Sequence, residues 1–195
     1  MNKLEGFYAL NDLRLPTVPW KQYKKDTPLD DGILWTIRSA VVRGDDLNLP
    51  RKIGVKSIEA KQFADSLIDK LGKNDLIIYY PFFIALKSGV IDVSRNRIVI
   101  EAVEDDLWNL VTYNKKDVTI IINGTDITYN GNSEFIKKSE LEELLRYGSM
   151  IKSAFRDDIY SGHSVLLEWS YSMKSDLNKC PIGRKKLVFY EIRTV

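Results

Sequence analysis

The chain of 195 residues has little of the residue types that form the commonest catalytic and metal sites. Its one histidine, His163, excludes a histidine-based metal cluster. Its place between Gly162 and Ser164 is more typical of a turn or a strand entry than of a catalytic residue. The one cysteine, Cys180, excludes an intrachain disulfide and fits a reducing, cytoplasmic setting. It precedes Pro181 in a predicted loop, with no partner for nucleophilic catalysis.

Other absences concern membranes, nucleic acids and phosphate-binding loops. No apolar run approaches the roughly 18 residues that a membrane helix needs, and residues 1–6 lack the apolar stretch of a signal peptide. The net charge of +2 is too small and too evenly spread to favour nucleic acid. The glycine motifs of dinucleotide-binding and P-loop proteins are missing as well. We therefore expect a soluble globular protein with a single domain over 1–195.

The hydrophobic pattern that is present predicts helices alternating with strands, an α+β order. Helices are expected over 3–14, 58–71 and 140–157, and strands over 33–41, 75–85, 89–93, 97–103, 118–122, 125–129, 165–169 and 187–193. Ser57 is expected to cap the second helix, and Ser139 with Glu142 to form a capping box at the third. The segment 43–50 is a predicted loop, and the pattern over 105–112 is ambiguous.

The last two predicted strands carry charges where a buried strand should be apolar. Residues i and i+2 share a face of a strand, so Glu191 and Arg193 should point the same way, together with Leu187 and Phe189. If the two strands pair as a hairpin, Glu168 can join that face. Two carboxylates and a guanidinium suit a divalent cation with phosphate. The alternative is a structural ion pair between Glu168 and Arg193.

Short segments spread along the chain, in order, match the motifs of a known family. They are Tyr8-Ala9-Leu10, Leu15–Pro19, Trp35–Ala40, Leu76–Phe83, Ser88-Gly89-Val90, Leu167-Glu168-Trp169 and Tyr190–Thr194. Together they resemble the N-terminal nucleotide-binding region of phosphoenolpyruvate synthase and pyruvate phosphate dikinase, an ATP-grasp fold. The resemblance implies two lobes of antiparallel sheet covered by helices. We place the lobes at 1–81 and 82–195, because Pro81 breaks a strand at the family's linker.

The resemblance also implies roles for individual residues. Arg38 would contact the nucleotide phosphates, and Arg193 would neutralise the phosphoryl group during transfer, so both are the expected catalytic residues. Tyr80 and Phe82, at the adenine-binding linker, would bind the cofactor ATP. Glu168 would hold Mg²⁺ that bridges the ATP phosphates. These roles agree with phosphoryl transfer as a reaction of positioning and charge stabilisation.

The chain departs from the family pattern at several positions. Glu5 stands where the family has a lysine, and Leu166 where it has an aspartate. Glu191 replaces a glutamine, adds a negative charge and is a second expected metal ligand. Residues 105–108 replace a glycine-rich stretch, and the loop over 44–50 is shortened. The family's phosphohistidine domain and pyruvate-binding barrel do not occur in this chain, so we expect a separate acceptor protein.

Three functions remain open on this evidence. The first is Mg-ATP binding with phosphate transfer to a separate acceptor, that is, an ATP-dependent phosphotransferase. The second is a degenerate ATP-grasp module that has lost catalysis and acts in binding or regulation. The third is an interaction protein whose charged strand face is an ion-pair cluster. In that case, an edge strand such as 118–122 would serve contact between copies of the chain.

Overall fold

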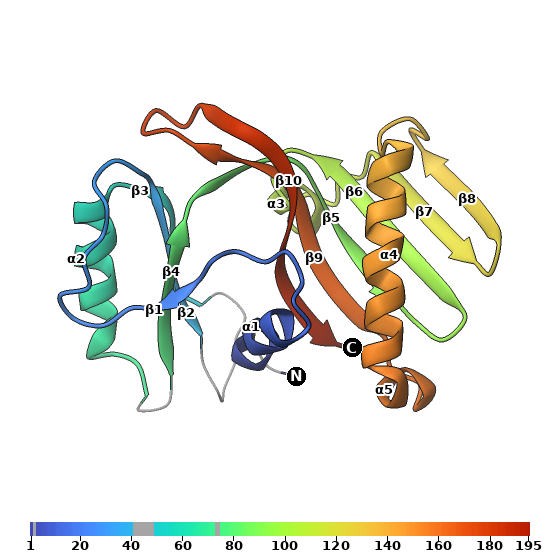
Figure 1. The fold of residues 1–195 in the computed structure, drawn as a ribbon, viewed down its shortest axis with the longest axis horizontal. Helices are drawn as coiled ribbons and strands as arrows, with labels where there is room; N and C mark the ends of the chain where they lie inside the picture. The colour runs from blue at the N-terminus through green and yellow to red at the C-terminus, as the bar shows by residue number, and fades with distance from the viewer. Residues whose placement is uncertain (2, 41–48, 73–74) are drawn as a thin grey trace.

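The computed structural model describes residues 1, 3–40, 49–72 and 75–195 (Figure 1). Apart from residues 49 and 50, the predicted loop over 43–50 lies outside these ranges. The described chain forms two antiparallel sheets with helices against them, as the sequence predicted. Within the described ranges, no helix is long and apolar enough to cross a membrane.

The first sheet has four strands, in the spatial order β1-β4-β2-β3. They are β1 (Lys21–Gln22), β2 (Trp35–Ala40), β3 (Arg51–Val55) and β4 (Leu76–Pro81). Helix α2 (Ser57–Ile68) buries Ala60, Ala64 and Leu67 against this sheet. Figure 1 shows this sheet and α2 together on the left of the molecule.

The second sheet has six strands, in the order β10-β9-β5-β6-β7-β8. They are β5 (Phe83–Val93), β6 (Arg97–Glu104), β7 (Val118–Asn123), β8 (Asp126–Gly131), β9 (Val165–Ser175) and β10 (Pro181–Thr194). The short helices α3 (Trp108–Val111) and α5 (Arg156–Tyr160) lie in its connections. Phe82 alone separates β4 of the first sheet from β5 of the second.

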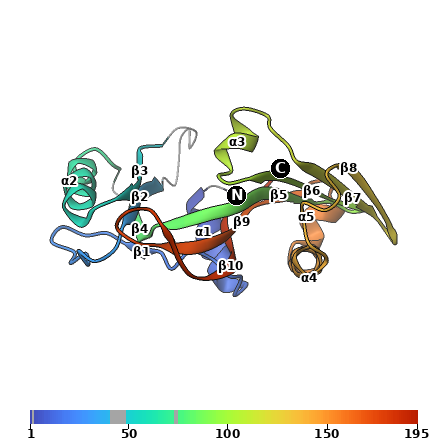
Figure 2. The same cartoon turned by 90° about the horizontal axis from the view of Figure 1, so that it is seen from above.

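Helix α4 (Lys138–Ala154) covers one face of the six-stranded sheet (Figure 2). Four of the six positions predicted for its apolar stripe are buried, Leu141, Leu144, Gly148 and Ile151, and the other two, Leu145 and Phe155, are half-buried. A side chain at Gly148 would lie only 3.2 Å from Ile91, so glycine lets the helix approach the sheet closely.

Helix α1 (Lys3–Asp12) also packs against this second sheet, on β10, although it starts the chain. A Cβ atom at Gly6 would lie 2.5 Å from the carbonyl oxygen of Ile192. Farther along, Phe189 donates a hydrogen bond to the carbonyl of Pro16 at 2.7 Å. The N-terminal segment therefore joins the last strand of the chain.

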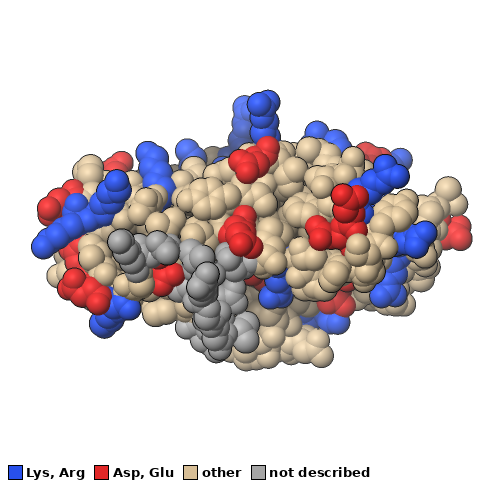
Figure 3. Space-filling model, turned by 90° about the horizontal axis from the view of Figure 1, so that it is seen from below, with Lys and Arg blue, Asp and Glu red and all other residues tan. Residues whose placement is uncertain are grey.

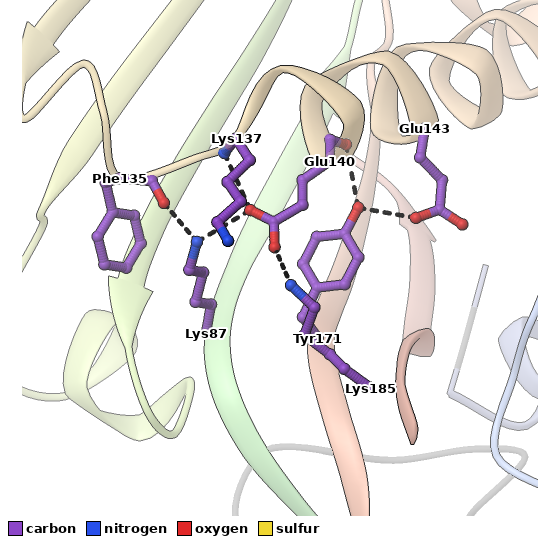
Figure 4. A network of polar contacts seen from close by, with 7 residues as sticks. All are labelled: Lys87, Phe135, Lys137, Glu140, Glu143, Tyr171 and Lys185. Atoms are coloured by element: carbon purple, nitrogen blue, oxygen red, sulfur yellow. Dashed lines mark hydrogen bonds and ion pairs between the residues drawn. The ribbon is translucent and has the colours of Figure 1, made fainter.

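A polar network ties α4 to the sheet beneath it (Figure 4). The Glu140 carboxylate accepts hydrogen bonds from Lys87 of β5, at 2.9 Å, and from Lys185 of β10. The Tyr171 hydroxyl of β9 lies 2.9 Å from the Glu143 carboxylate and 3.0 Å from the Glu140 carbonyl. Burial raises the pKa of Glu140, but the hydrogen bonds from Lys185 and Lys87 outweigh burial and leave this pKa lowered.

Two predicted helix caps are wrong. The N-cap of α2 is Lys56, and the Ser57 hydroxyl instead donates to the carboxylate of Asp31. Helix α4 begins before Ser139, and it is Glu140 that reaches back to accept the backbone N–H of Lys137 at 3.0 Å. In both cases, a partner distant in sequence or a shifted helix start took the place of the local capping signal.

The strands also differ from expectation in several places, the short strand β1 and the longer β9 and β10 among them. The segment 118–122 is not an edge, because β7 lies between β6 and β8. The strand expected over 89–93 begins six residues earlier, at Phe83. Strand β3 was not expected at all.

Acidic and basic side chains are interspersed on the face drawn in Figure 3, in keeping with the small net charge.

Candidate functional site

Two adjoining cavities lie where the two sheets meet. Their volumes are about 120 Å³ and about 740 Å³, and the larger falls within the range typical of ligand sites. They share six lining residues, Arg38, Arg51, Ile53, Asp106, Leu107 and Glu168. The two cavities therefore form one hollow with two ends.

All the residues that the sequence singled out as a site line this hollow. Arg38 of β2 and Glu168 of β9 line both cavities. The smaller cavity adds Tyr80, of β4, and Phe82, and the larger cavity adds Glu191 and Arg193 of β10. Strands from both sheets thus bring together residues far apart in the chain, while the roles given to these residues stay predictions.

A β-bulge in β10 turns Glu191 toward the hollow. Phe189 lies opposite Trp169 and Glu191 lies opposite Glu168, so Tyr190 is an extra residue in the ladder. In a regular ladder, with Tyr190 paired like its neighbours, Glu191 would share the face of Phe189, which is fully buried in the core under α4. The expectation that Phe189 and Leu187 share the face of Glu191 is therefore wrong, since both lie in that core.

Arg38 is nearly buried and is surrounded by opposite charge. Its Nη2 lies 3.9 Å from Oε2 of Glu191, and the two side chains are 12% and 11% exposed. Burial acts to lower the pKa of Arg38, but Tyr80, Glu191 and Glu168 raise it, and the net shift is upward. The guanidinium therefore stays charged at the floor of the hollow.

Arg193 has a buried donor that the described part of the chain does not satisfy. Its Nε is buried without a hydrogen-bond partner there. An unsatisfied buried donor costs about 1–3 kcal/mol, so a ligand oxygen that accepts from it would bind favourably. Other atoms of Arg193 line the larger cavity.

Arg51, Asp106 and Trp108 also line the larger cavity and were missed by sequence reasoning. The guanidinium of Arg51 lies 5.0 Å from the ring centre of Trp108, so a cation–π contact joins β3 to α3 across the cavity. The sequence signal for Arg51 was the run from Arg51 to Val55. Gly54, at φ +63°, interrupts its strand pattern.

The charges around the larger cavity balance. Its described lining includes three arginines and three carboxylates, Arg38, Arg51, Arg193, Asp106, Glu168 and Glu191. The smaller cavity is more apolar, with Ile53, Phe82, Phe83, Ala85 and Leu107 in its walls. The residues that line only the smaller cavity carry no charge, whereas Glu191 and Arg193 line only the larger one, and four charged side chains line both.

Tyr190 and Ser170 place hydroxyl groups in the wall of the smaller cavity. Burial raises the pKa of Tyr190 to about 12, so the hydroxyl is protonated at neutral pH. It lies 3.1 Å from the Ser172 hydroxyl. The smaller cavity therefore offers hydrogen-bonding groups beside its apolar wall.

The metal ligands of the site would come from two carboxylates. Within the described ranges, no group of three or more His, Cys, Asp or Glu side chains is placed to hold a metal ion. Glu168 and Glu191 are direct cross-strand neighbours and both line the larger cavity. Glu5, which stands in place of the family lysine, is exposed on α1 and lines neither cavity.

Comparison with known proteins identifies the fold. No family model and no curated protein matches the chain. Among solved structures, D-alanine–D-alanine ligase from Helicobacter pylori superposes with a TM-score of 0.51 at 12% identity, over 98% of this chain and 50% of the ligase. L-amino acid ligase from Bacillus licheniformis gives a TM-score of 0.47 at 11% identity, over 98% of this chain and 39% of the ligase.

The chain spans half the length of the first ligase and less than half the length of the second. At this identity the likeness to the D-alanine–D-alanine ligase bears on fold and not on activity. It agrees with the two antiparallel sheets and the helices described above. It therefore supports the resemblance to the ATP-grasp fold, but it does not support the more specific resemblance to phosphoenolpyruvate synthase. The chain has an α+β, ATP-grasp-like fold.

Proposed function

We propose that the hollow between the two sheets binds Mg-ATP. The observation that supports this most is a lining drawn from both sheets, in which aromatic side chains belong to the smaller cavity and charged side chains continue from it into the larger one. The purine would lie in the smaller cavity beside Phe82 and Tyr80. The phosphates would lie in the larger cavity, where Arg38 and Arg193 offer forked donors that suit phosphate oxygens.

The two neighbouring carboxylates fit magnesium. Mg²⁺ is usually held by one or two carboxylates together with substrate phosphates, and Glu168 and Glu191 supply such a pair. Bound there, the ion would neutralise phosphate charge and fix the orientation of the phosphate oxygens. Because two carboxylates leave most of the ion's coordination to phosphate and water oxygens, we expect the metal to bind together with the nucleotide and weakly without it.

For activity, we propose phosphate transfer to a separate acceptor. This rests on the resemblance to phosphoenolpyruvate synthase, whose phosphohistidine domain suggests a protein acceptor. Arg193 would stabilise the charge of the moving phosphoryl group, and Arg38 would hold the remaining phosphates in place.

A second candidate function is nucleotide binding without catalysis. The observation in its favour is the position of Glu5, whose exposed carboxylate replaces the family lysine outside both cavities. In this case the domain would respond to ATP as a binding or regulatory module. Assays of ATP consumption with candidate acceptors, a phosphohistidine carrier protein and D-alanine among them, distinguish the two. Consumption that depends on an acceptor supports transfer, and binding alone supports the module.

Thermal unfolding tests the binding proposal. At about 100 times its dissociation constant, Mg-ATP should stabilise the chain by about 2.7 kcal/mol, whereas Mg²⁺ alone should have little effect. Trp108 gives a second readout, since it is 45% exposed at the cavity while Trp35 and Trp169 are buried. Nucleotide should change the tryptophan fluorescence of the wild type, and this change should be lost in Trp108→Phe. No thermal shift with ATP, ADP or GTP would overturn the proposal.

The variant Glu168→Gln separates a metal ligand from a structural charge. Its matched control is Glu101→Gln. Val90 of β5 lies opposite Glu168 on one side and opposite Glu101 on the other, so the two glutamates share a sheet face, but Glu101 lines neither cavity. Glu168→Gln should lose the Mg²⁺-dependent part of the ATP shift and keep its own unfolding temperature, while the control keeps both. A large loss of stability in Glu168→Gln without ligand would instead indicate a structural ion pair.

A further inference from the structure

The two edges of the six-stranded sheet differ in how they are protected. One edge, β10, carries Pro181 and the basic run Arg184-Lys185-Lys186, and its register is interrupted twice. These are features by which proteins prevent edge strands from pairing with other chains. The other edge, β8, has no proline, lysine or arginine, and its register with β7 is unbroken from Asp126 to Gly131.

The backbone of β8 presents hydrogen-bonding groups at this edge. Just beyond β8, the backbone N–H of Asn132 donates to the carbonyl of Asp117 on the neighbouring chain segment. Hydrogen-bonded pairs alternate along an antiparallel ladder, so the even-numbered residues of β8 are the ones bonded to β7. The backbone N–H and C=O groups of Ile127 and Tyr129 therefore point away from β7. All six residues of β8 are exposed, and Figure 1 shows the strand at the outer side of the sheet, to the right of α4.

The side chains of Ile127 and Tyr129 share the face that α4 covers farther along the sheet. They lie opposite the buried Ile122 and Ile120, yet they are 44% and 39% exposed. They line a groove of about 730 Å³ whose other wall includes Leu141 of α4. The charged side chains of the groove are two acidic and two basic ones, Glu134, Glu142, Lys137 and Lys138.

We propose that β8 pairs antiparallel with β8 of a second copy of the chain, around a two-fold axis at Thr128. In this register, Ile127 of each copy forms a hydrogen-bonded pair with Tyr129 of the other, which uses the outward backbone groups of both. A β-branched residue then lies against an aromatic one on the same face, and the two Thr128 residues meet at the axis. Asp126 lies opposite Asn130, so no like charges meet.

The groove charges also favour a second copy as the occupant. Two acidic and two basic side chains leave the groove without net charge, so a second copy meets no net charge repulsion there, whereas a strongly acidic or basic partner would gain no attraction. The pairing joins six strands from each copy into one sheet, with both α4 helices on the same face. It closes the unprotected edge without a change in the fold of either copy.

Light scattering after size exclusion, over a dilution series, tests the association. The wild type should form a dimer that dissociates on dilution. Tyr129→Pro should weaken it by about tenfold or more, because two backbone hydrogen bonds are lost per dimer, while pairing with β7 keeps its bonds. Ile127→Lys should act alike, and Ile58→Lys, at an exposed position of α2, should not. A wild type that is monomeric at every concentration, or a dimer unchanged in Tyr129→Pro and Ile127→Lys, would overturn the proposal.

Cysteine crosslinking tests the register. In a Cys180→Ser background, Thr128→Cys should form a disulfide-linked dimer on mild oxidation, because the residues of a non-hydrogen-bonded pair lie about 4.5 Å apart. Asn130→Cys is the matched control on the same strand and face. Its two copies would lie about 13 Å apart along the strands, too far to be linked. Linkage of Asn130→Cys, or no linkage of Thr128→Cys, would overturn this register.

Discussion

The carboxylate of Glu140 tests how firmly α4 is held on the six-stranded sheet, and its replacement by glutamine should destabilise the protein. The Glu140 side chain is 5% exposed, and it pairs with Lys87 and Lys185, which are 20% and 38% exposed. Removal of one partner from a buried pair costs about 3–5 kcal/mol. Lys185 can remain in water, so the lower end applies, and we expect Glu140→Gln to cost about 3 kcal/mol.

Chemical and thermal unfolding would measure this loss. For a chain of this length, about 3 kcal/mol corresponds to a fall in unfolding temperature of about 6–12 °C. Glu59→Gln is the matched control, because the Lys52–Glu59 pair is 40% and 49% exposed and should contribute at most about 1 kcal/mol. A loss of less than about 1 kcal/mol in Glu140→Gln would refute the reasoning, since the buried network would then be no stronger than a surface pair.

The pH dependence of stability gives a second measurement on the same residue. The pKa of Glu140 is lowered in the fold, so its contribution is present above the unfolded pKa, about 4.3, and is lost as the pH falls through the lower folded value. The wild type should therefore lose stability in this acidic range. In Glu140→Gln the loss should be shallower, and equal slopes for the two proteins would contradict the assignment.

Two further substitutions test the packing and the charge of the site. Gly89→Ala should cost about 1–3 kcal/mol in urea unfolding, because its Cβ would lie 2.2 Å from the Glu101 carbonyl oxygen and 2.5 Å from the Trp169 ring; a loss below about 0.5 kcal/mol would contradict this packing. Glu191→Gln removes the acidic partner of Arg38 and one proposed metal ligand. In calorimetric titrations it should weaken ATP binding with Mg²⁺ but not with a chelator, and equal weakening in both would argue against a metal ligand at this position.

Local patterns predicted the elements whose formation depends on their own residues. The stripe of α4 and the hairpin of β7 and β8 follow from apolar spacing and from the turn at Gly124, and both occur in the fold. The two last strands also pair, which was the condition for Glu168 to join the face of Glu191 and Arg193. Among the candidate site residues, Glu168, Glu191 and Arg193 were singled out as charges within otherwise apolar strands, whereas Arg38, Tyr80 and Phe82 were assigned roles through the family resemblance, and all these roles stay predictions.

Strand β3 and the cap of helix α2 could not be predicted in the same way, because distant partners decide them. Arg51–Val55 is short and half exposed, and it is a strand only because it pairs with β2. Ser57 has the residue type of a cap, but a carboxylate 26 positions earlier binds its hydroxyl. Arg51 was missed as a site residue because its position at the cavity depends on β3, a strand that its own sequence does not predict.

The bulge at Tyr190 shows most clearly where sequence reasoning about the site reaches its limit. The i, i+2 rule assigns Glu191 to the face of Phe189, and in a regular ladder that face is the core under α4. A carboxylate there would be buried among apolar side chains at a large cost. One extra residue in β10 reverses the direction of Glu191 and Arg193, and sets them beside Glu168 at the larger cavity. The prediction that these three charges share a face was therefore right, and the face was wrong, because a single insertion in the ladder exchanges the two sides of a strand.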